Sequence, residues 1–201
     1  SSTFAAGTGI SSLSSSTGSC NVTTSDTSCE ITPPSVTPNS GYIASNWTES
    51  GTSNTYGINE NIPVSTNGKT YTANAVSANY KNTSTNTYYL TLDSAFSEVS
   101  SNQTIQVLND VVENTNATLS SDKNGVKLDL NGKTIELNAS INNAGNLDIY
   151  NSGTFGGVIE GKQTMFIRNN GFLSINGTSD DSQVTIKVTI PSSYSLGTSN
   201  D

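Results

Sequence analysis

The sequence contains no histidine, a single arginine (Arg168), and charged residues that make up only 12% of the 201 positions. The absence of histidine excludes histidine-based acid–base catalysis and histidine-ligated zinc. The formal net charge is −8, and a nucleic-acid-binding protein needs Lys and Arg to neutralise phosphates, so nucleic acid is excluded as a partner. No apolar run has the length of a bilayer, so we expect no membrane insertion by this segment.

Polar uncharged residues dominate the chain: Ser, Thr and Asn make up about 87 of the 201 residues. Apolar residues amount to 32%, which is low for a domain with a thick core, yet they recur in regular alternation. A disordered chain would lack that order. Thin, repetitive β architecture accounts for both observations, because each strand then buries only one face. We therefore expect an all-β protein, and we expect it to be a segment of a longer chain.

Two cysteines, Cys20 and Cys29, lie on either side of the turn-forming sequence "TTSD". If Val22 and Ile31 belong to the two strands of a hairpin, the two sulfur atoms could face one another and form a disulfide. Small secreted domains often need such a crosslink, so we expect the disulfide. Two free thiols are the alternative, and the CxxC spacing of redox and zinc sites is absent.

Up to about residue 76, short strand signals alternate with turns rich in Pro, Gly and Ser. The three prolines within residues 33–38 favour an extended edge or a loop, because proline cannot donate a hydrogen bond within a sheet. The bulky residues of this region are expected to form a small core. They are Trp47, Tyr42 and Tyr56.

The segment "PSVTPNSGYIASNWTESGT", together with the later "YTANAV", resembles the Listeria–Bacteroides repeat, also called the internalin B-type repeat. The shared pattern is an aromatic residue at "SGY", a tryptophan a few residues later, and a closing strand with Tyr and Ala. The resemblance implies a small β-grasp-like module over residues 1–77. It also implies a bacterial surface protein, because such modules occur there in tandem.

Residues 78–87 form a polar stretch that we interpret as a linker to a second region, residues 88–201. In the second region, apolar residues at positions 92, 95, 96 and 99 follow helical spacing, and Asp93 falls in the first turn. The pattern predicts a short helix over residues 92–99. We expect this helix to cap the open end of the structure that follows it.

From residue 104 onward the sequence repeats itself. Segments that open with Gly125, Gly145 and Gly171 combine alternating apolar residues with asparagine near a turn, and the glycines lie 20 and 26 residues apart. Such periods are typical of solenoids, in which each repeat buries its inner face against its neighbours. The alignment predicts two inward columns and one ladder of stacked asparagines. The first column is Leu128, Leu147 and Leu173, the second is Leu130, Ile149 and Ile175, and the ladder is Asn131, Asn151 and Asn176.

The motif "DLNGKTI" and the repeats around it resemble the right-handed parallel β-helix of the pectate-lyase-like superfamily, in the form frequent in bacterial surface proteins. The resemblance implies a short parallel β-helix over residues 88–201. It bears on the fold more than on the function, since this architecture carries many unrelated roles. The basic residue and calcium-binding acidic cluster of the family's enzymes cannot be assigned to any position in this sequence.

Asp129 and Asp148 are the strongest candidates for a catalytic pair. Both alternate with inward apolar residues, so they should point outward on adjacent repeats, at a strand spacing of about 4.8 Å. A retaining glycosidase needs two carboxyl groups about 5–5.5 Å apart, and calcium could also bind such a pair. The alternative is two solvated residues on the outer face, as Ser174 in the third copy suggests. We adopt this alternative and expect no catalytic residue, metal or cofactor.

Other side chains are weaker candidates. Trp47 and the pair Tyr88 and Tyr89 could stack against sugars, although core packing is the commoner fate of aromatic residues. Asp180 and Asp181 could bind calcium, but a solvated loop is the commoner role of such a pair.

These observations favour a non-enzymatic segment of a secreted or cell-surface bacterial protein, such as an adhesin or a structural stalk on the cell wall. A glycan or a host surface protein is the expected class of partner, and we expect a monomer. Two alternatives stay open. One is a fragment of a carbohydrate-active enzyme, either a polysaccharide lyase or a glycoside hydrolase, which would gather acidic residues in one groove. The other is a piece of a phage tail spike, which would form a trimer.

Overall fold

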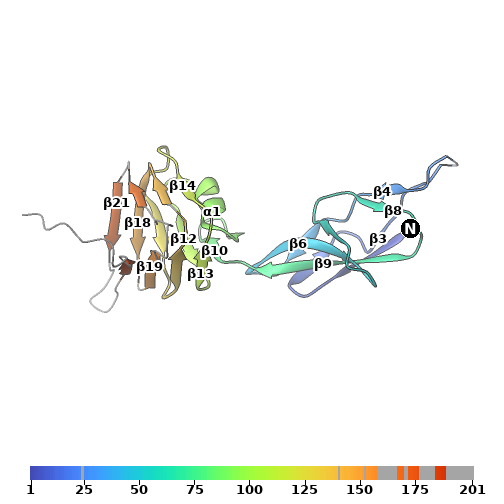
Figure 1. Ribbon diagram of the computed structural model, residues 1–201, viewed down its shortest axis with the longest axis horizontal. Helices are drawn as coiled ribbons and strands as arrows, with labels where there is room; N and C mark the ends of the chain where they lie inside the picture. The colour runs from blue at the N-terminus through green and yellow to red at the C-terminus, as the bar shows by residue number, and fades with distance from the viewer. Residues whose placement is uncertain are drawn as a thin grey trace, which may run out of the picture. The chain divides into compact units, whose positions relative to one another are not determined.

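The computed structural model divides into two compact units, Ser1–Ser77 (unit 1) and Ala78–Asp201 (unit 2) (Figure 1). The division coincides with the end of the expected repeat-like module. The described residues form strands and turns with one short helix, so the protein is all-β in class. The structure describes residues 1–23, 25–139, 141–151, 153–157, 167–169, 172–176 and 184–188, and it describes side chains as far as residue 153.

Unit 1 is built on a mixed five-stranded sheet in the order β3-β1-β9-β6-β7. Its first and last strands, β1 and β9, pair in parallel at the centre, and the other pairs are antiparallel. Two further pairs, β2 with β5 and β4 with β8, complete the unit. The strands are β1 (Ser2–Ala6), β2 (Ile10–Leu13), β3 (Thr17–Gly18), β4 (Cys29–Ile31), β5 (Val36–Pro38), β6 (Tyr42–Glu49), β7 (Thr55–Gly57), β8 (Ile62–Val64) and β9 (Lys69–Ser77).

The core of unit 1 is aromatic. Trp47 is fully buried, and its ring packs edge-on against Phe4 with the ring centroids 5.0 Å apart. Phe4 also stacks on Tyr71. The indole Nε1–H donates to the carbonyl oxygen of Ile58 at 3.1 Å, so the one polar atom of the indole is satisfied inside the core. Trp47 is therefore a core residue as predicted.

The other two aromatic residues that were predicted for the core are only half-buried. Tyr56 is half-buried and packs edge-on against Tyr71. Tyr42 is also half-buried and lies over Gly9, where an added Cβ would come within 2.7 Å of the tyrosine ring. Phe4 on β1 and Tyr71 on the central strand β9 are the buried aromatic residues that the predicted core did not include.

Cys20 and Cys29 form the predicted disulfide, with their Cα atoms 5.9 Å apart. The hairpin that was expected to align them is wrong. Cys29 begins β4, and β4 pairs antiparallel with β8 rather than with the segment around Val22. The disulfide therefore joins the segment before β4 to the first residue of β4, and β4 itself is held by its pairing with β8.

Unit 2 begins with strands where a linker was expected. β10 (Tyr80–Asn82) and β11 (Thr87–Tyr89) form an antiparallel hairpin, so the interpretation of residues 78–87 as a linker is wrong. The polar composition of this segment led to the wrong interpretation, because one of its polar residues, Asn82, is buried at an inward position of β10. Its Nδ2 donates to Gln103 Oε1 at 2.8 Å, and its Oδ1 accepts from the backbone N–H groups of Ser84 and Thr85.

The predicted short helix is confirmed as α1 (Leu92–Glu98). Thr91 is its N-cap, since the Thr91 side chain accepts a hydrogen bond from the backbone N–H of Ser94. Leu92, Ala95 and Phe96 are buried in the core of unit 2. Figure 1 shows α1 beside β10 at one end of the stacked strands, which is the end that the helix was expected to cover.

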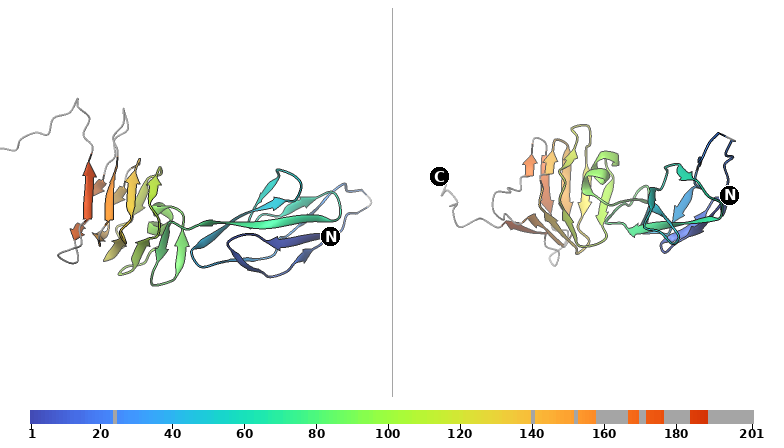
Figure 2. Two further views of the ribbon diagram at one scale, coloured as in Figure 1. Left: turned by 90° about the horizontal axis from the view of Figure 1, so that it is seen from below. Right: turned by 45° about the vertical axis from the view of Figure 1, so that its right-hand side comes forward.

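After α1, the described residues pass four times through two parallel ladders and three times through a third, and we number these passages repeats 1 to 4. Every neighbouring pair in the ladders is parallel. Figure 2 shows the strands of successive repeats stacked side by side. The first ladder contains β12 (Thr104–Val107), β15 (Val126–Asp129), β18 (Asn146–Tyr150) and β21 (Phe172–Asn176). The second contains β13 (Val111–Glu113), β16 (Thr134–Leu137), β19 (Gly153–Gly157) and β22 (Val184–Val188), and the third contains β14 (Ala117–Leu119), β17 (Ile141–Asn143) and β20 (Ile167–Asn169).

The register of the first ladder corrects both predicted columns. Leu128 lies opposite Ile105 and Ile149, whereas Leu147 lies opposite Val126. Strand pairing continues from Leu147 to Leu173 and from Ile149 to Ile175, whose side chains lie outside the described residues. Leu130 is buried but follows the end of β15. The predicted steps from Leu147 to Leu173 and from Ile149 to Ile175 are thus confirmed, whereas the predicted step from repeat 2 to repeat 3 was two residues out. A slip of two residues keeps the same side chains inward, so alternation could not reveal that error.

Candidate functional site

Asp129 lies at the end of β15 on the outer face of the first ladder, and yet its side chain is only 6% exposed. Its carboxylate accepts from Gln106 Nε2 at 3.0 Å, from the backbone N–H of Asn131 at 2.9 Å, and from Asn151 Nδ2 at 2.7 Å. Gln106 belongs to repeat 1, Asp129 to repeat 2 and Asn151 to repeat 3. The carboxylate therefore links three successive repeats through charge-assisted hydrogen bonds.

The predicted pairing of Asp129 with Asp148 is wrong. Asp148 lies opposite Lys127 and Ser174, while Asp129 lies opposite Tyr150. The two aspartates are thus offset by two residues on neighbouring strands, which puts their Cα atoms roughly 8 Å apart. Both oxygens of Asp129 are also engaged by the donors described above. Among the described residues, the outer face of this ladder therefore has no directly opposed pair of carboxylates, which the glycosidase interpretation required.

The predicted asparagine ladder also needs correction. Asn131 and Asn151 both adopt left-handed backbone conformations, with φ of 50° and 65°, at the turn after the first-ladder strand. Asn131 Nδ2 donates to the carbonyl oxygen of Val107 at 3.0 Å, so it bonds to the backbone of the preceding repeat. Asn176 lies on β21 opposite Tyr150 rather than at this turn. An amide-to-amide bond between repeats occurs elsewhere, where Asn138 Nδ2 donates to Asn114 Oδ1 at 3.1 Å.

Glu113 is a second carboxylate of low exposure, at 3%, and the sequence analysis did not identify it. It lies opposite Leu137 in the second ladder and occupies an inward position. One of its oxygens accepts from the Tyr80 hydroxyl at 2.7 Å and from the backbone N–H of Leu92, the first residue of α1, at 3.0 Å. Burial, followed by the charge of Glu113, raises the pKa of Tyr80. Glu113 thus joins the hairpin, the helix and repeat 1.

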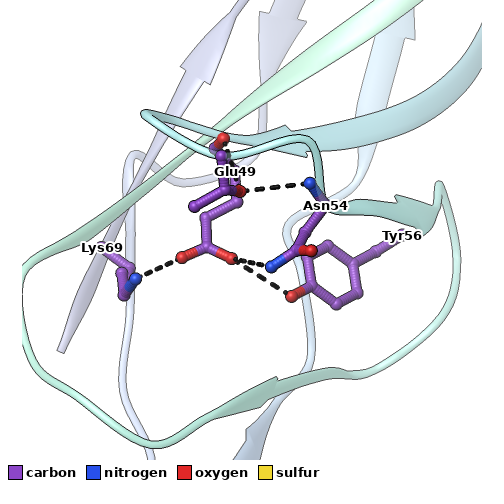
Figure 3. Close-up of polar contacts among 5 residues, drawn as sticks. Glu49, Asn54, Tyr56 and Lys69 are labelled. Carbon is purple, nitrogen blue, oxygen red and sulfur yellow. Dashed lines mark hydrogen bonds and ion pairs between the residues drawn. The ribbon is translucent and has the colours of Figure 1, made fainter.

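Glu49 forms the corresponding cluster in unit 1 (Figure 3). Its side chain forms an ion pair with Lys69, and its Oε2 accepts from Asn54 Nδ2 at 3.0 Å and from the Tyr56 hydroxyl at 3.3 Å. These residues meet because β6, which ends at Glu49, pairs with both β7 and β9. The hydrogen bond from Lys69, and then the one from Asn54, hold the pKa of Glu49 below its usual value of 4.5.

The Glu49 cluster predicts that unit 1 loses stability in acid. A carboxyl group whose pKa is lowered by folding stabilises the folded state above its unfolded pKa, and this contribution disappears as the pH falls below about 4.5. Urea unfolding followed by the fluorescence of Trp47, the sole tryptophan, measures unit 1 alone. Between about pH 6 and pH 3 the free energy of unfolding should fall less in Glu49→Gln than in the wild type. Equal falls in the two proteins would contradict this role of Glu49.

The remaining candidates divide between core, surface and undescribed positions. Trp47 and Tyr89 are buried and cannot stack on a sugar, whereas Tyr88 is half-exposed. Arg168 lies opposite Asn142 in the third ladder, and its side chain is outside the described residues. Asp180 and Asp181 also lie outside the described residues. Among the residues that are described, no group of three or more acidic or cysteine side chains could hold a metal ion.

A small cavity of about 110 Å³ lies beside the disulfide in unit 1. Cys20, Val22, Ile31 and Val64 contribute apolar parts of its lining, and Asn67 contributes a polar part. Ligand pockets for drug-sized molecules measure about 300–1,000 Å³, so this cavity is small for such a ligand. It contains no carboxylate and therefore offers no acid–base chemistry.

Comparison with known proteins found no match, whether to a family model, to a curated protein or to a solved structure. In the part of the chain that the structure describes, no helix has the length and apolar character needed to cross a membrane.

Two of the three carboxylate clusters could have been found from the sequence. Glu113 follows Val111 at a spacing of two, so period-2 alternation places a carboxylate on the inward face, where it needs buried partners. The sequence did indicate Asp129 as a candidate. Its hydrogen-bond donors come partly from the repeats on both sides, however, and the register of those repeats was not known. Glu49 gave no local signal, because Lys69 and Asn54 approach it only after the sheet has formed.

Proposed function

We propose that this chain is a non-enzymatic, structural or adhesin-like segment of a secreted or cell-surface bacterial protein, with a glycan or a host surface protein as its partner. In this proposal unit 1 is a β-grasp-like module of the Listeria–Bacteroides repeat type, and unit 2 is a short parallel β-helix. The central parallel pairing of the first and last strands supports the first assignment. The repeated passage through parallel ladders supports the second.

The bonding of Asp129 is the observation that carries the proposal. A catalytic carboxylate must present an oxygen or a proton to the substrate. Asp129 instead accepts three hydrogen bonds that join repeats 1, 2 and 3. Glu113 and Glu49 are likewise engaged in bonds between elements of the fold. These carboxylates therefore support a structural role for the chain.

The disulfide is consistent with an oxidising compartment, because such crosslinks persist in secreted and surface proteins and are rare in the cytosol. The net charge of −8 and the polar composition suit a surface exposed to solvent. Antibodies raised against the chain are expected to label intact cells of the source bacterium. Labelling that requires permeabilised cells would contradict the surface location.

The structural role of Asp129 predicts a specific result for Asp129→Asn. The substitution replaces one acceptor oxygen by an NH₂ group that faces existing donors, so unit 2 should lose about 1–3 kcal/mol of unfolding free energy. Neither the wild type nor the variant should release reducing ends from pectin, xylan or chitin. Cleavage by the wild type that disappears in Asp129→Asn at unchanged stability would overturn the proposal in favour of an enzyme.

A further inference from the structure

Outward-facing side chains of five neighbouring strands in unit 2 align at one level of the sheet. Each lies next to a buried residue of its own strand, so all five share the outer face. We call this set the outer row. Strand pairing places its members in the order Tyr88 (β11), Lys81 (β10), Gln106 (β12), Asp129 (β15) and Tyr150 (β18).

Each end of the outer row is a half-buried tyrosine with a lysine against its ring. Lys81 Nζ lies 5.7 Å from the ring centroid of Tyr88, and Lys127 Nζ lies 5.7 Å from that of Tyr150. The Cα atoms of the two tyrosines are four strand spacings apart, or roughly 19 Å. Rings that are held in this way lose little conformational entropy when a ligand packs on them.

The middle of the outer row is polar and rigid. Gln106 Nε2 donates to Asp129, whose carboxylate is fixed further by Asn131 and Asn151. Among the described residues, the side-chain carbonyl oxygen of Gln106 has no hydrogen-bond partner, so it is available to accept a bond from a ligand hydroxyl. The row therefore combines two apolar rings with planar hydrogen-bonding groups between them.

Charge decides which class of ligand this surface suits. Lys81 and Lys127 on the outer face are balanced by Asp129 and Asp148. Because the chain as a whole carries −8, an acidic polymer would be repelled by the rest of the molecule. A neutral glycan has C–H faces that pack on aromatic rings and hydroxyl groups that bond to amides and carboxylates.

We propose that the outer row binds a neutral polysaccharide that lies across the strands, from Tyr88 to Tyr150. This inference rests on the proposed surface function and locates the glycan site of that function. The ligand chain crosses repeats 1 to 3, so the stacking of the repeats sets the spacing of the contacts. Tyr88 and Tyr150 anchor the ligand, and Gln106 bonds to hydroxyl groups between them.

The test uses the whole 201-residue chain on an array of cello-, manno-, xylo- and galacto-oligosaccharides, with polygalacturonate and heparin as acidic probes. The variants are Tyr88→Ala, Tyr150→Ala and Gln106→Ala, and the matched control is Tyr42→Ala, which removes a half-buried tyrosine of unit 1. At least one neutral oligosaccharide should bind the wild type and the control equally. Its affinity should fall about tenfold or more in each tyrosine variant, as expected when an aromatic anchor is removed.

Three outcomes would overturn the site: no neutral oligosaccharide binds, only acidic probes bind, or both tyrosine variants bind as tightly as the wild type. Thermal unfolding of each variant identifies any that fails to fold. If Tyr150→Ala does not fold, the affinity of Tyr88→Ala decides whether the site exists. Tyr88 is suited to this because it lies on the edge strand β11. None of these outcomes alters the reducing-end assay or the labelling of intact cells, which test the proposed function separately.

Discussion

Replacement of Leu128 by Ala is expected to lower the free energy of unfolding of unit 2 by about 2–5 kcal/mol, the range for a large-to-small change in a packed core. Leu128 is fully buried, and strand pairing places it between Ile105 of repeat 1 and Ile149 of repeat 3. A cavity at this position removes contacts on both sides of repeat 2. Leu128 belongs to one core cluster with residues of the second and third ladders, so its truncation leaves a cavity inside a core that all three ladders share.

The measurement is urea unfolding followed in parallel by far-ultraviolet circular dichroism, which reports both units, and by fluorescence of Trp47, which reports unit 1. The matched control is Val112→Ala, which truncates a side chain that is 49% exposed in the same unit. The control should change the free energy of unfolding by no more than about 0.5 kcal/mol. If Leu128→Ala and the Val112→Ala control have the same free energy of unfolding, the assigned packing of Leu128 is contradicted.

Replacement of Glu113 by Ala is expected to cost unit 2 about 2–4 kcal/mol, because two donors would lose their acceptor inside the core. The donors are the hydroxyl of Tyr80, which is fully buried, and the backbone N–H of Leu92 at the start of α1. Without this acceptor, the hairpin and the helix lose their shared link to repeat 1. The end of the stack that α1 covers should then open more often.

Glu113→Gln is the matched variant, since its amide oxygen can still accept from one or both donors, and it should destabilise unit 2 by clearly less than Ala. Hydrogen exchange followed by mass spectrometry should show faster exchange across residues 92–98 in Glu113→Ala, with unit 1 unchanged. Equal stability of the Ala and Gln variants, with unaltered exchange in α1, would show that Glu113 does not hold the cap.

Features with strong local signals were predictable from the sequence. The helix follows from the apolar spacing at 92, 95, 96 and 99 and from the Thr91 cap, which depend on adjacent residues alone. The disulfide was predictable from composition, although the hairpin proposed to align it was not correct. All-β class followed from period-2 alternation and from the lack of helix-forming residues.

Features that depend on the pairing of distant strands were not predictable in the same way. Both the observed register and one slipped by two residues bury the same side chains, so the sequence cannot distinguish Leu128–Ile149 from Leu128–Leu147. The register determines which residues lie beside Asp129, and those residues determine the role of its carboxylate. The linker prediction failed for a related reason, since buried Asn82 is satisfied by hydrogen bonds that polarity alone does not reveal.

The stacking of the repeats depends on the register of the first ladder, and engineered disulfides distinguish the observed register from the slipped one. Lys127 and Asp148 lie directly opposite each other, at a Cα separation of about 4.8 Å that a disulfide can span. The slipped register would instead place Lys127 opposite Asn146, which in the observed register is roughly 8 Å away and out of reach. Both double variants keep the native disulfide between Cys20 and Cys29.

The decisive measurement is the intact mass after alkylation without reductant. The Lys127→Cys, Asp148→Cys protein should form the new disulfide and take up no alkyl group, while the Lys127→Cys, Asn146→Cys protein should be alkylated at both engineered thiols. A disulfide in the second protein and free thiols in the first would contradict the stacking of repeats on which the fold, the role of Asp129 and the glycan site all depend.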